Sequence, residues 1–182
     1  MPRRAVFLDR DGVLTIPVFR DGRSYAARTL EEFRLYPDAK DAVRRLKKED
    51  FLVIVVTNQP DVTTGKLPER TLEEMHARLM RGVPVDDIEV SIATRDAPDD
   101  RRKPATGMLR DAAIKWDIDL NSSYMVGDRA SDVTCGVCAG CRTVFIDLGY
   151  TAETPPTEQN ATVANLAEAV AWICADMRQG DA

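Results

Sequence analysis

The sequence has few aromatic side chains, no excess of positive charge and no long apolar run. Aromatic residues make up only 6% of the 182 positions, and the formal net charge is −5. Nucleic acids and anionic membranes attract basic surfaces, and single strands also stack on aromatic side chains. We therefore expect neither a nucleic acid nor a membrane among the partners of this protein.

The short length of the apolar segments also bears on where the protein is located. After Arg3 and Arg4 the first apolar run covers only residues 5–8, which is too short for a signal peptide core, and no segment approaches the length of a membrane span. We expect a cytoplasmic protein, in which the Asn160-Ala161-Thr162 sequon stays unglycosylated.

The cysteines are too few for a metal site of their own. Cys135, Cys138 and Cys141 have a suggestive spacing, but no fourth cysteine follows soon after them, and His76, the sole histidine, lies in a different predicted helix. A structural zinc or an iron–sulfur cluster needs a fourth ligand. We interpret the three thiols as small packing residues on a helix that ends at Gly140.

What the sequence does contain is typical of a globular protein. The hydrophobic fraction of 44% is enough for a sizeable core, and the length predicts one domain over residues 1–182. Apolar runs predict strands over residues 5–8, 51–56, 88–93, 123–126 and 143–146. Helical periodicity predicts helices over residues 38–49, 68–80, 105–116, 131–139 and 163–177. Residues 151–159 look like a linker to the last helix.

Strands that alternate with helices predict an α/β fold, a doubly wound, Rossmann-like parallel sheet sandwiched by helices. Ligands of such sheets bind beyond the carboxyl ends of the strands. The polar residues at those ends are Asp9 and Asp11, then Thr57-Asn58-Gln59, then Gly127-Asp128-Arg129. We expect all of them to meet at one edge of the sheet.

The first of these segments, Phe7-Leu8-Asp9-Arg10-Asp11-Gly12, suggests phosphoryl transfer. Carboxylates of Asp9 and Asp128 and the backbone carbonyl of Asp11 can supply oxygen ligands to Mg²⁺. Asp9 could then attack phosphorus, while Asp11 protonates the leaving alkoxide and later activates water. Taken alone, the two acids could equally be a solvated turn.

Three other candidate residues also have simpler structural explanations. Thr57 could hold phosphoryl oxygens or merely end a strand, and Lys103 could balance charge or belong to a solvated basic run. Asp132 could cap the following helix or support the site from behind. It is the ordered combination of these residues that carries the functional interpretation.

That combination resembles the haloacid dehalogenase (HAD) superfamily of phosphatases over roughly residues 5–149. Within it, the segments Val56-Thr57-Asn58-Gln59, Arg102-Lys103-Pro104 and Tyr124-Met125-Val126-Gly127-Asp128-Arg129 look like those of heptose 1,7-bisphosphate phosphatases and histidinol phosphatases. The resemblance implies a Mg²⁺-dependent phosphoric monoester hydrolase acting on a small phosphorylated sugar, most closely D-glycero-D-manno-heptose 1,7-bisphosphate at its 7-phosphate.

The resemblance also implies roles for individual residues. Asp9 would be the nucleophile, Asp11 the proton donor, and Thr57 and Lys103 the phosphoryl-stabilising residues. Magnesium would bind Asp9, Asp11 and Asp128. The expected substrate contacts are Arg10, Asn58, Gln59, Arg102 and Arg129.

Two departures from the family pattern shape further expectations. Only 45 residues separate Asp11 from Thr57, and another 45 separate Thr57 from Lys103, so no cap domain fits and the loop over residues 16–28 should cover the site. Residues 93–101 lack the cysteines and histidine of the family's zinc loop. We expect no zinc, and a loop ordered by Pro98 and ion pairs.

Three alternatives to a heptose bisphosphatase stay open at this stage. They are a histidinol-phosphate phosphatase, a polynucleotide 3′-phosphatase, which the acidic charge disfavours, and a receiver-like signalling domain. A receiver carries its phosphorylated aspartate after a middle strand of the chain and lacks a second acid placed like Asp11. We expect a monomer or a weak homodimer.

Overall fold

The computed structural model describes residues 2–20 and 22–180, and its centre is a parallel sheet. Within these residues the sheet has six strands, in the spatial order β5 (Asp87–Ser91), β4 (Leu52–Asn58), β1 (Ala5–Leu8), β6 (Tyr124–Gly127), β7 (Arg142–Ile146) and β8 (Ala161–Val163). The expected α/β fold with a parallel sheet is confirmed.

The central strands are apolar on both faces. All four side chains of β1 are fully buried, as are the first six of β4. Phe7 pairs with Ile54 on one side and with Met125 on the other. A strand covered on both faces loses its polar alternation, which is why β1 and β4 are continuous apolar runs in the sequence.

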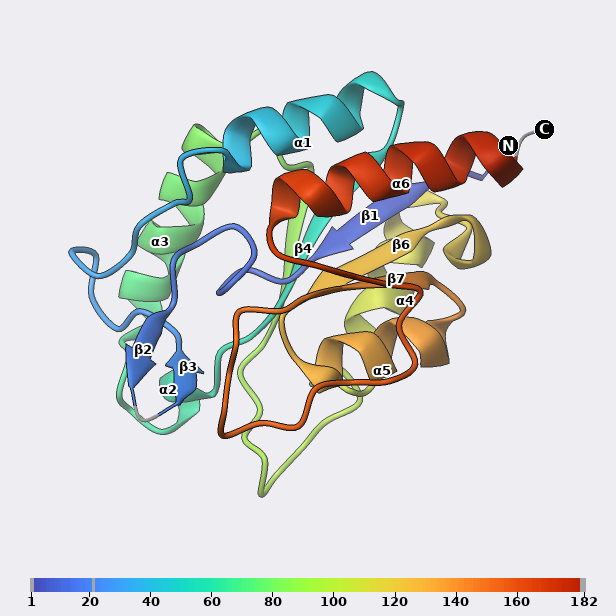
Figure 1. The fold of residues 1–182 in the computed structure, drawn as a ribbon. Coiled ribbons are helices and arrows are strands. Elements are labelled where there is room, and N and C mark those ends of the chain that lie inside the picture. The colour runs from blue at the N-terminus through green and yellow to red at the C-terminus, as the bar shows by residue number, and fades with distance from the viewer. Residues whose placement is uncertain (1, 21, 181–182) are drawn as a thin grey trace.

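Helices cover both faces of the sheet (Figure 1). One face carries α1 (Ala39–Lys48), α3 (Glu69–Gly82) and α6 (Leu166–Gly180), and the other carries α4 (Gly107–Trp116) and α5 (Ala130–Ala139). A short helix, α2 (Pro60–Thr63), and the 3-10 turn η1 (Leu120–Ser122) complete the helical elements of the described residues.

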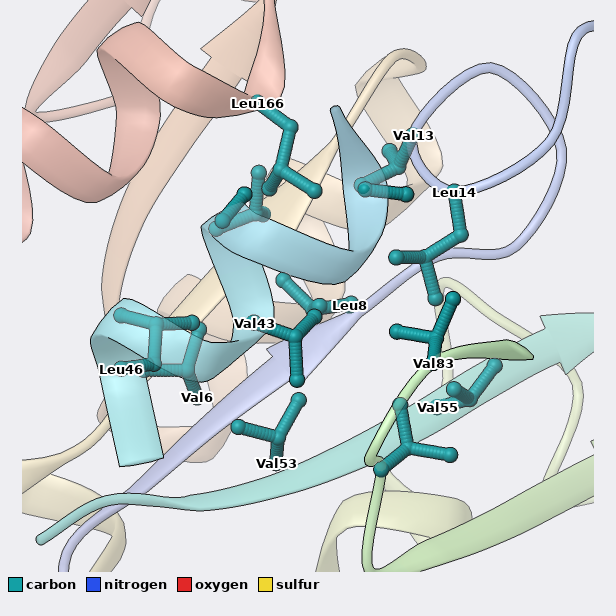
Figure 2. Packing of buried hydrophobic residues seen from close by; sticks show 14 of the residues in the cluster. Val6, Leu8, Val13, Leu14, Val43, Leu46, Val53, Val55, Val83 and Leu166 are labelled. Atoms are coloured by element: carbon teal, nitrogen blue, oxygen red, sulfur yellow. The ribbon is translucent and has the colours of Figure 1, made fainter. Parts of the chain in front are cut away.

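Each face has its own hydrophobic core. On the first face Val43 and Leu46 of α1 pack onto Val6 of β1, together with Leu8, Val53 and Val55 of the sheet (Figure 2). On the second face Met108, Leu109 and Ala112 of α4 pack onto Phe7 and Ile54. Alternate side chains of β1 therefore anchor opposite layers, and this fixes the strand rigidly at the centre.

The structure also contains elements that the sequence patterns did not reveal. Residues 16–28 hold an antiparallel hairpin of β2 (Val18–Arg20) and β3 (Arg23–Tyr25), and the region before the last helix holds β8. Both strands of the hairpin and β8 are only three residues long, too short for a periodicity to show. The last helix begins at Leu166 rather than at Val163, because Val163 belongs to β8.

Two further findings concern what lies outside the sheet. The segments between β1 and β4 and between β4 and β5 are occupied by the hairpin and by α1, α2 and α3, with no inserted cap domain among the described residues. Over the same residues, no helix has both the length and the apolar character needed to cross a membrane.

Candidate active site

The polar ends of β1, β4 and β6 meet at one edge of the sheet. Asp9 follows β1 directly, Thr57 and Asn58 end β4, and Asp128 follows β6. Because β1 lies between β4 and β6, these three strand ends are neighbours. Asp9, Thr57 and Asn58 line a cavity of about 620 Å³, together with Asp11, Lys103 and Asp132. Asp128 is not itself among the lining residues, but the next residue, Arg129, is.

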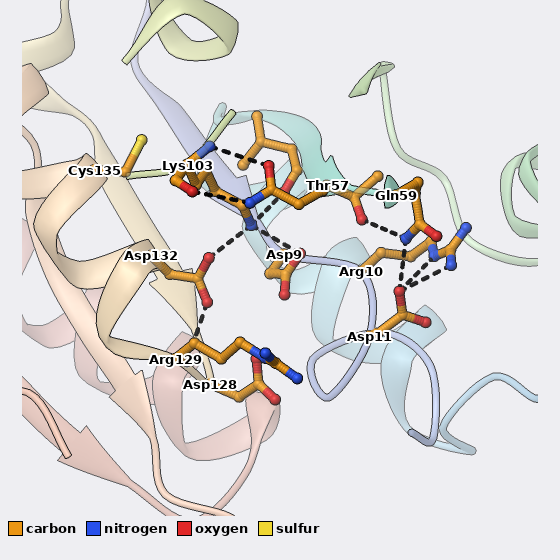
Figure 3. A network of polar contacts seen from close by, with 12 residues as sticks. Asp9, Arg10, Asp11, Thr57, Gln59, Lys103, Asp128, Arg129, Asp132 and Cys135 are labelled. Atoms are coloured by element: carbon orange, nitrogen blue, oxygen red, sulfur yellow. Dashed lines mark hydrogen bonds and ion pairs between the residues drawn. The ribbon is translucent and has the colours of Figure 1, made fainter. Parts of the chain in front are cut away.

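Three buried carboxylates lie close together at this edge of the sheet (Figure 3). Ligand atoms of Asp9, Asp128 and Asp132 all lie within 4.8 Å of one another. Burial raises the pKa of Asp9 to about 6, with Lys103 opposing the shift and Asp132 adding to it. Burial, followed by the charges of Asp9 and Asp132, raises the pKa of Asp128 well above its usual value.

The donor set fits a hard divalent cation. Oδ1 of Asp128 is buried and has no hydrogen-bond partner within the described part of the chain. A buried carboxylate oxygen without a donor is costly, and oxygen ligands are those that Mg²⁺ prefers. Asp9 and Asp128 are therefore the side chains best placed to hold such an ion, as expected from the sequence.

Lys103 is held between two of the acids. Its Nζ lies 2.9 Å from Oδ1 of Asp9 and 2.6 Å from Oδ1 of Asp132, and it donates to the backbone carbonyl of Val56 at 2.8 Å. Burial would lower the pKa of Lys103, but the charges of Asp132 and Asp9 raise it instead. Lys103 is therefore a fixed cation beside Asp9.

Asp132 supports this arrangement from the start of α5. One carboxylate oxygen meets Lys103, and the other accepts a hydrogen bond from the backbone N–H of Arg129 at 3.1 Å. Both oxygens of Asp132 are thus engaged, although the residue is near enough to belong to the acidic group. This placement agrees with a supporting position behind Asp9 and Asp128.

The carboxylate of Asp11 points elsewhere. Its Oδ2 accepts hydrogen bonds from Arg10 and from Nε2 of Gln59, and its Oδ1 accepts one from Thr15. Burial would raise the pKa of Asp11, but the nearby Arg10 charge and these hydrogen bonds lower it. The side chain of Asp11 is therefore outside the acidic group, so a metal contact from this residue would have to come from its backbone carbonyl.

Arg10 does not lie where a substrate contact was expected. Its side chain is fully buried and is absent from the cavity wall, although the acids on both sides of it in the sequence line that wall. The guanidinium lies over the ring of Phe33, 5.4 Å from the centroid, and is paired with Asp11. The expectation for Arg10 is corrected accordingly: it faces the core behind the site.

Asn58 and Gln59 line the cavity and also hold other site residues. Asn58 bonds the backbone of Lys103 twice, accepting from its N–H and donating to its carbonyl, both at 3.0 Å. Gln59 donates to Thr57 and to Asp11, each at 2.8 Å. Whatever contact they make with a ligand, both side chains fix their neighbours.

Two arginines face the cavity from opposite loops. Arg102 donates to the carbonyl of Ala93 at 2.7 Å, and burial together with the charge of Arg95 lowers its pKa. Arg129 donates to the backbone and side chain of Ser24 in the hairpin, at 2.7 Å each. Both are available at the wall of the cavity, where substrate contacts were expected.

The mouth of the cavity is framed by the β2–β3 hairpin and the segment after β7. Residues 23–26 and 152–154 both line the cavity, and Phe19 stacks on Tyr150 with ring centroids 5.7 Å apart. The expectation that residues 16–28 cover the site is consistent with this placement.

Tyr150 is a site residue that sequence reasoning missed. Its hydroxyl donates to Oδ2 of Asp128. Burial and the charge of Asp128 raise its pKa. Ligands of parallel sheets bind beyond the carboxyl ends of the strands, and Tyr150 lies four residues after the end of β7. That rule could have identified Tyr150, but the family resemblance was drawn only as far as Gly149.

The three neighbouring cysteines lie in different environments. Cys135 and Cys141 are buried, Cys138 is exposed, and all are free thiols. Cys135 donates to the backbone carbonyl of Ala105. Cys135 and Cys141 belong to the hydrophobic core of the second face, as the interpretation as packing residues requires, whereas the exposed Cys138 does not fit it.

Comparison with known proteins points to hydrolases. The HAD-hydrolase-like family matches residues 100–171. D-glycero-β-D-manno-heptose-1,7-bisphosphate 7-phosphatase of Pseudomonas putida is 36% identical over 151 residues, 80% of this chain and 83% of the relative. A histidine biosynthesis bifunctional protein of Bacteroides fragilis is 33% identical over 80% of this chain, which corresponds to 40% of that longer protein.

A solved structure shares the whole fold. The D,D-heptose 1,7-bisphosphate phosphatase of B. bronchiseptica, crystallised with magnesium and phosphate, superposes with a TM-score of 0.80 at 27% identity. The likeness covers 95% of this chain and 99% of that one.

Proposed function

Since this chain belongs to the HAD-like hydrolase family and is a phosphoric monoester hydrolase, we propose that its substrate is D-glycero-D-manno-heptose 1,7-bisphosphate, cleaved at the 7-phosphate in a Mg²⁺-dependent reaction. The observation that carries the chemistry is the group of three buried carboxylates with Lys103 at the carboxyl edge of the sheet. The likeness to a heptose bisphosphatase supports the substrate.

In this proposal Asp9 is the nucleophile. Lys103 occupies its Oδ1, so we assign the attack on phosphorus to the other carboxylate oxygen, which forms an aspartyl-phosphate as the P–O bond to the sugar breaks. Lys103 and the hydroxyl of Thr57 would stabilise the phosphoryl oxygens. Water then attacks phosphorus, releases phosphate and restores the carboxylate of Asp9.

Asp11 would act first as the general acid and then as the general base. We assign to its protonated form the transfer of a proton to the leaving sugar alkoxide. In the second half the resulting carboxylate would take a proton from the attacking water, so the carboxyl group ends the cycle protonated, as it began. Mg²⁺ held by Asp9 and Asp128 would supply positive charge that lets an anionic nucleophile approach an anionic ester.

The charge of the cavity wall supports a substrate with two phosphates. Besides Lys103, its lining includes six cationic side chains: Arg23, Arg28, Lys66, Arg95, Arg102 and Arg129. One phosphate would lie at Asp9, and the second would find cations at the mouth. We include Asn58, Gln59, Arg102 and Arg129 among the substrate contacts.

Histidinol phosphate is a second candidate, because of the likeness to the Bacteroides fragilis protein of histidine biosynthesis. The single phosphate of histidinol phosphate could be hydrolysed by the same group of residues around Asp9. Its ammonium group, however, would face the cationic wall, and like charges repel. We therefore rank the bisphosphate first.

The nucleophile is tested by Asp9→Asn. This change keeps the shape of the side chain but removes its charge, so we expect hydrolysis to fall at least about a thousandfold while the protein still folds. Turnover is measured with Mg²⁺ present and the fold by circular dichroism. The control is Asp41→Asn on the outside of α1, which should leave both unchanged. Near-normal turnover of Asp9→Asn would refute the mechanism.

The substrate is tested by comparing hydrolysis rates. We expect kcat/KM for the heptose bisphosphate to exceed that for histidinol phosphate and for a 3′-phosphorylated oligonucleotide. The position of the remaining phosphate in the product, read by ³¹P NMR, tests cleavage at the 7-phosphate. A preference for histidinol phosphate would overturn the proposed substrate and leave the proposed chemistry standing.

A further inference from the structure

Arg10 is a buried cation directly behind the reacting centre. It stands between Asp9 and Asp11 in the sequence, and its side chain is completely enclosed. Desolvating a guanidinium is expensive unless its N–H groups are satisfied. Such a residue is poorly explained as packing alone, so its partners indicate what it does.

The partners of Arg10 come from three separate parts of the chain. Nε and Nη2 donate to Oδ2 of Asp11, at 3.1 and 2.8 Å, and Nη1 lies 3.2 Å from Nε2 of His76 in α3. The face of the guanidinium lies against Phe33. The side chain is therefore fixed at its edge and on its face, and neither His76 nor Phe33 is among the residues that line the cavity.

His76 acts as an acceptor in this arrangement. A guanidinium has donors only, so Nε2 of His76 must carry the lone pair and Nδ1 the proton. In agreement, burial and the charge of Arg10 lower the pKa of His76 to about 4. A neutral imidazole can hold Arg10 without competing for the charge of Asp11.

Asp11 is oriented entirely by this network. Oδ2 receives hydrogen bonds from Arg10 and Gln59, and Oδ1 receives one from Thr15, while the residue lines the cavity (Figure 3). A carboxylate held by donors on both oxygens has little freedom to rotate. A catalytic group displaced by about 1 Å can lose on the order of a hundredfold in rate.

We infer that Arg10, anchored by His76 and Phe33, is a positioning residue that sets the orientation of the Asp11 carboxylate on the cavity wall for proton transfer to the leaving group. Neither Arg10 nor His76 touches the substrate in this assignment. The inference rests on the proposed role of Asp11 as the proton donor.

The leaving group provides the test. A sugar alkoxide must be protonated as it leaves, whereas p-nitrophenolate departs without help. We expect His76→Ala to lower the single-turnover rate of leaving-group release from the heptose bisphosphate by about tenfold or more, and the same rate for p-nitrophenyl phosphate far less. Leaving-group release is measured because hydrolysis of the aspartyl-phosphate, in which Asp11 also takes part, is common to both substrates. A loss of general packing would lower both rates together.

Further variants sharpen this comparison. Arg10→Lys keeps the buried charge, but one ammonium cannot span Asp11 and His76, so the same selective loss is expected. His76→Gln keeps an acceptor within reach and should recover most of the activity. Met80→Ala, at an exposed position of α3, is the control without effect.

Asp11→Asn separates the inference from the proposed function. If leaving-group release by this variant is not slowed selectively for the sugar ester, the proposed role of Asp11 as proton donor is wrong. If Asp11→Asn does show this selective loss, the His76→Ala and Arg10→Lys variants decide the positioning role. That role is overturned if these two variants slow leaving-group release equally for both substrates, if they slow it for neither, or if both fail to fold by circular dichroism.

Discussion

The carboxyl group of Asp9 shows how burial changes the protonation of a single residue. Its pKa of about 6 reflects desolvation first, and the nearby Lys103 only partly compensates. In the metal-free protein the folded state therefore binds a proton more tightly than the unfolded state. This group alone makes the metal-free protein more stable as the pH falls from above 6 toward 4.

Magnesium binding should consequently compete with protons. We expect the apparent affinity for Mg²⁺ to be highest above pH 7 and to fall as the pH drops below about 6, because Asp9 must lose its proton to become a ligand. Titration calorimetry in buffers of different ionisation enthalpy measures the protons released. An affinity independent of pH between 5 and 8 would contradict the proposed ligand.

Gly12 is a second residue whose local conformation protects the site. Its φ of +91° is left-handed, and a Cβ placed on it would overlap the carboxylate of Asp128. We expect Gly12→Ala to weaken Mg²⁺ binding at least about tenfold and to destabilise the fold by about 1–3 kcal/mol. Calorimetry and thermal unfolding measure the two effects.

Gly65 supplies the matched control for this change. It has a comparable φ of +72°, but a Cβ there would meet nothing within 4 Å. Gly65→Ala should therefore share the loss of stability and leave Mg²⁺ binding intact. Equal Mg²⁺ affinities in the two variants would show that the Gly12–Asp128 contact is unimportant.

At the scale of elements, the loop between β5 and α4 is organised by one carboxylate. Oδ1 of Asp99 accepts hydrogen bonds from the backbone N–H groups of Arg101 and Arg102, at 3.1 and 2.7 Å, and from Ser91 at 3.2 Å. Arg101 adds ion pairs with Glu89 and Asp111. These contacts hold the segment that presents Arg102 and Lys103 to the cavity, and they involve neither thiol nor imidazole.

Asp99→Ala should loosen this loop. Because a hydrogen bond to a charged group contributes about 1.5 kcal/mol or more, we expect KM for the phosphorylated sugar to rise about fivefold or more, with a smaller change in kcat. Steady-state kinetics measure both constants. Asp96→Ala removes the same charge from an exposed position of the loop and should change neither. Identical kinetics for the two variants would remove Asp99 from this role.

The whole molecule depends on two cores that share one sheet. Ile173 of α6 is fully buried in the core of the first face, whereas Ile114 of α4 is 84% exposed. We expect Ile173→Ala to lower the free energy of unfolding by about 2–5 kcal/mol, and Ile114→Ala to change it by less than about 0.5 kcal/mol. Urea unfolding of the metal-free protein measures both. Equal effects would contradict the burial of α6 against the sheet.

The sequence alone determined the order of the long helices, the order of the five strands from β1 to β7 that build most of the sheet, and the residues at their ends. Apolar runs as long as that of β4 and the regular spacing of helices are local patterns, so the parallel sheet followed from them. The meeting of Asp9, Thr57 and Asp128 at one edge then followed from the topology of such sheets.

Only the tertiary structure decided where the side chains point and which distant residues join them. Arg10 was expected to contact substrate, yet it lies in the core, because Phe33 and His76 from other parts of the chain provide its pocket. Tyr150 reaches Asp128 through a loop that has no periodic pattern. Contacts of this kind arise from packing between segments far apart in the sequence, and a local pattern carries no record of them.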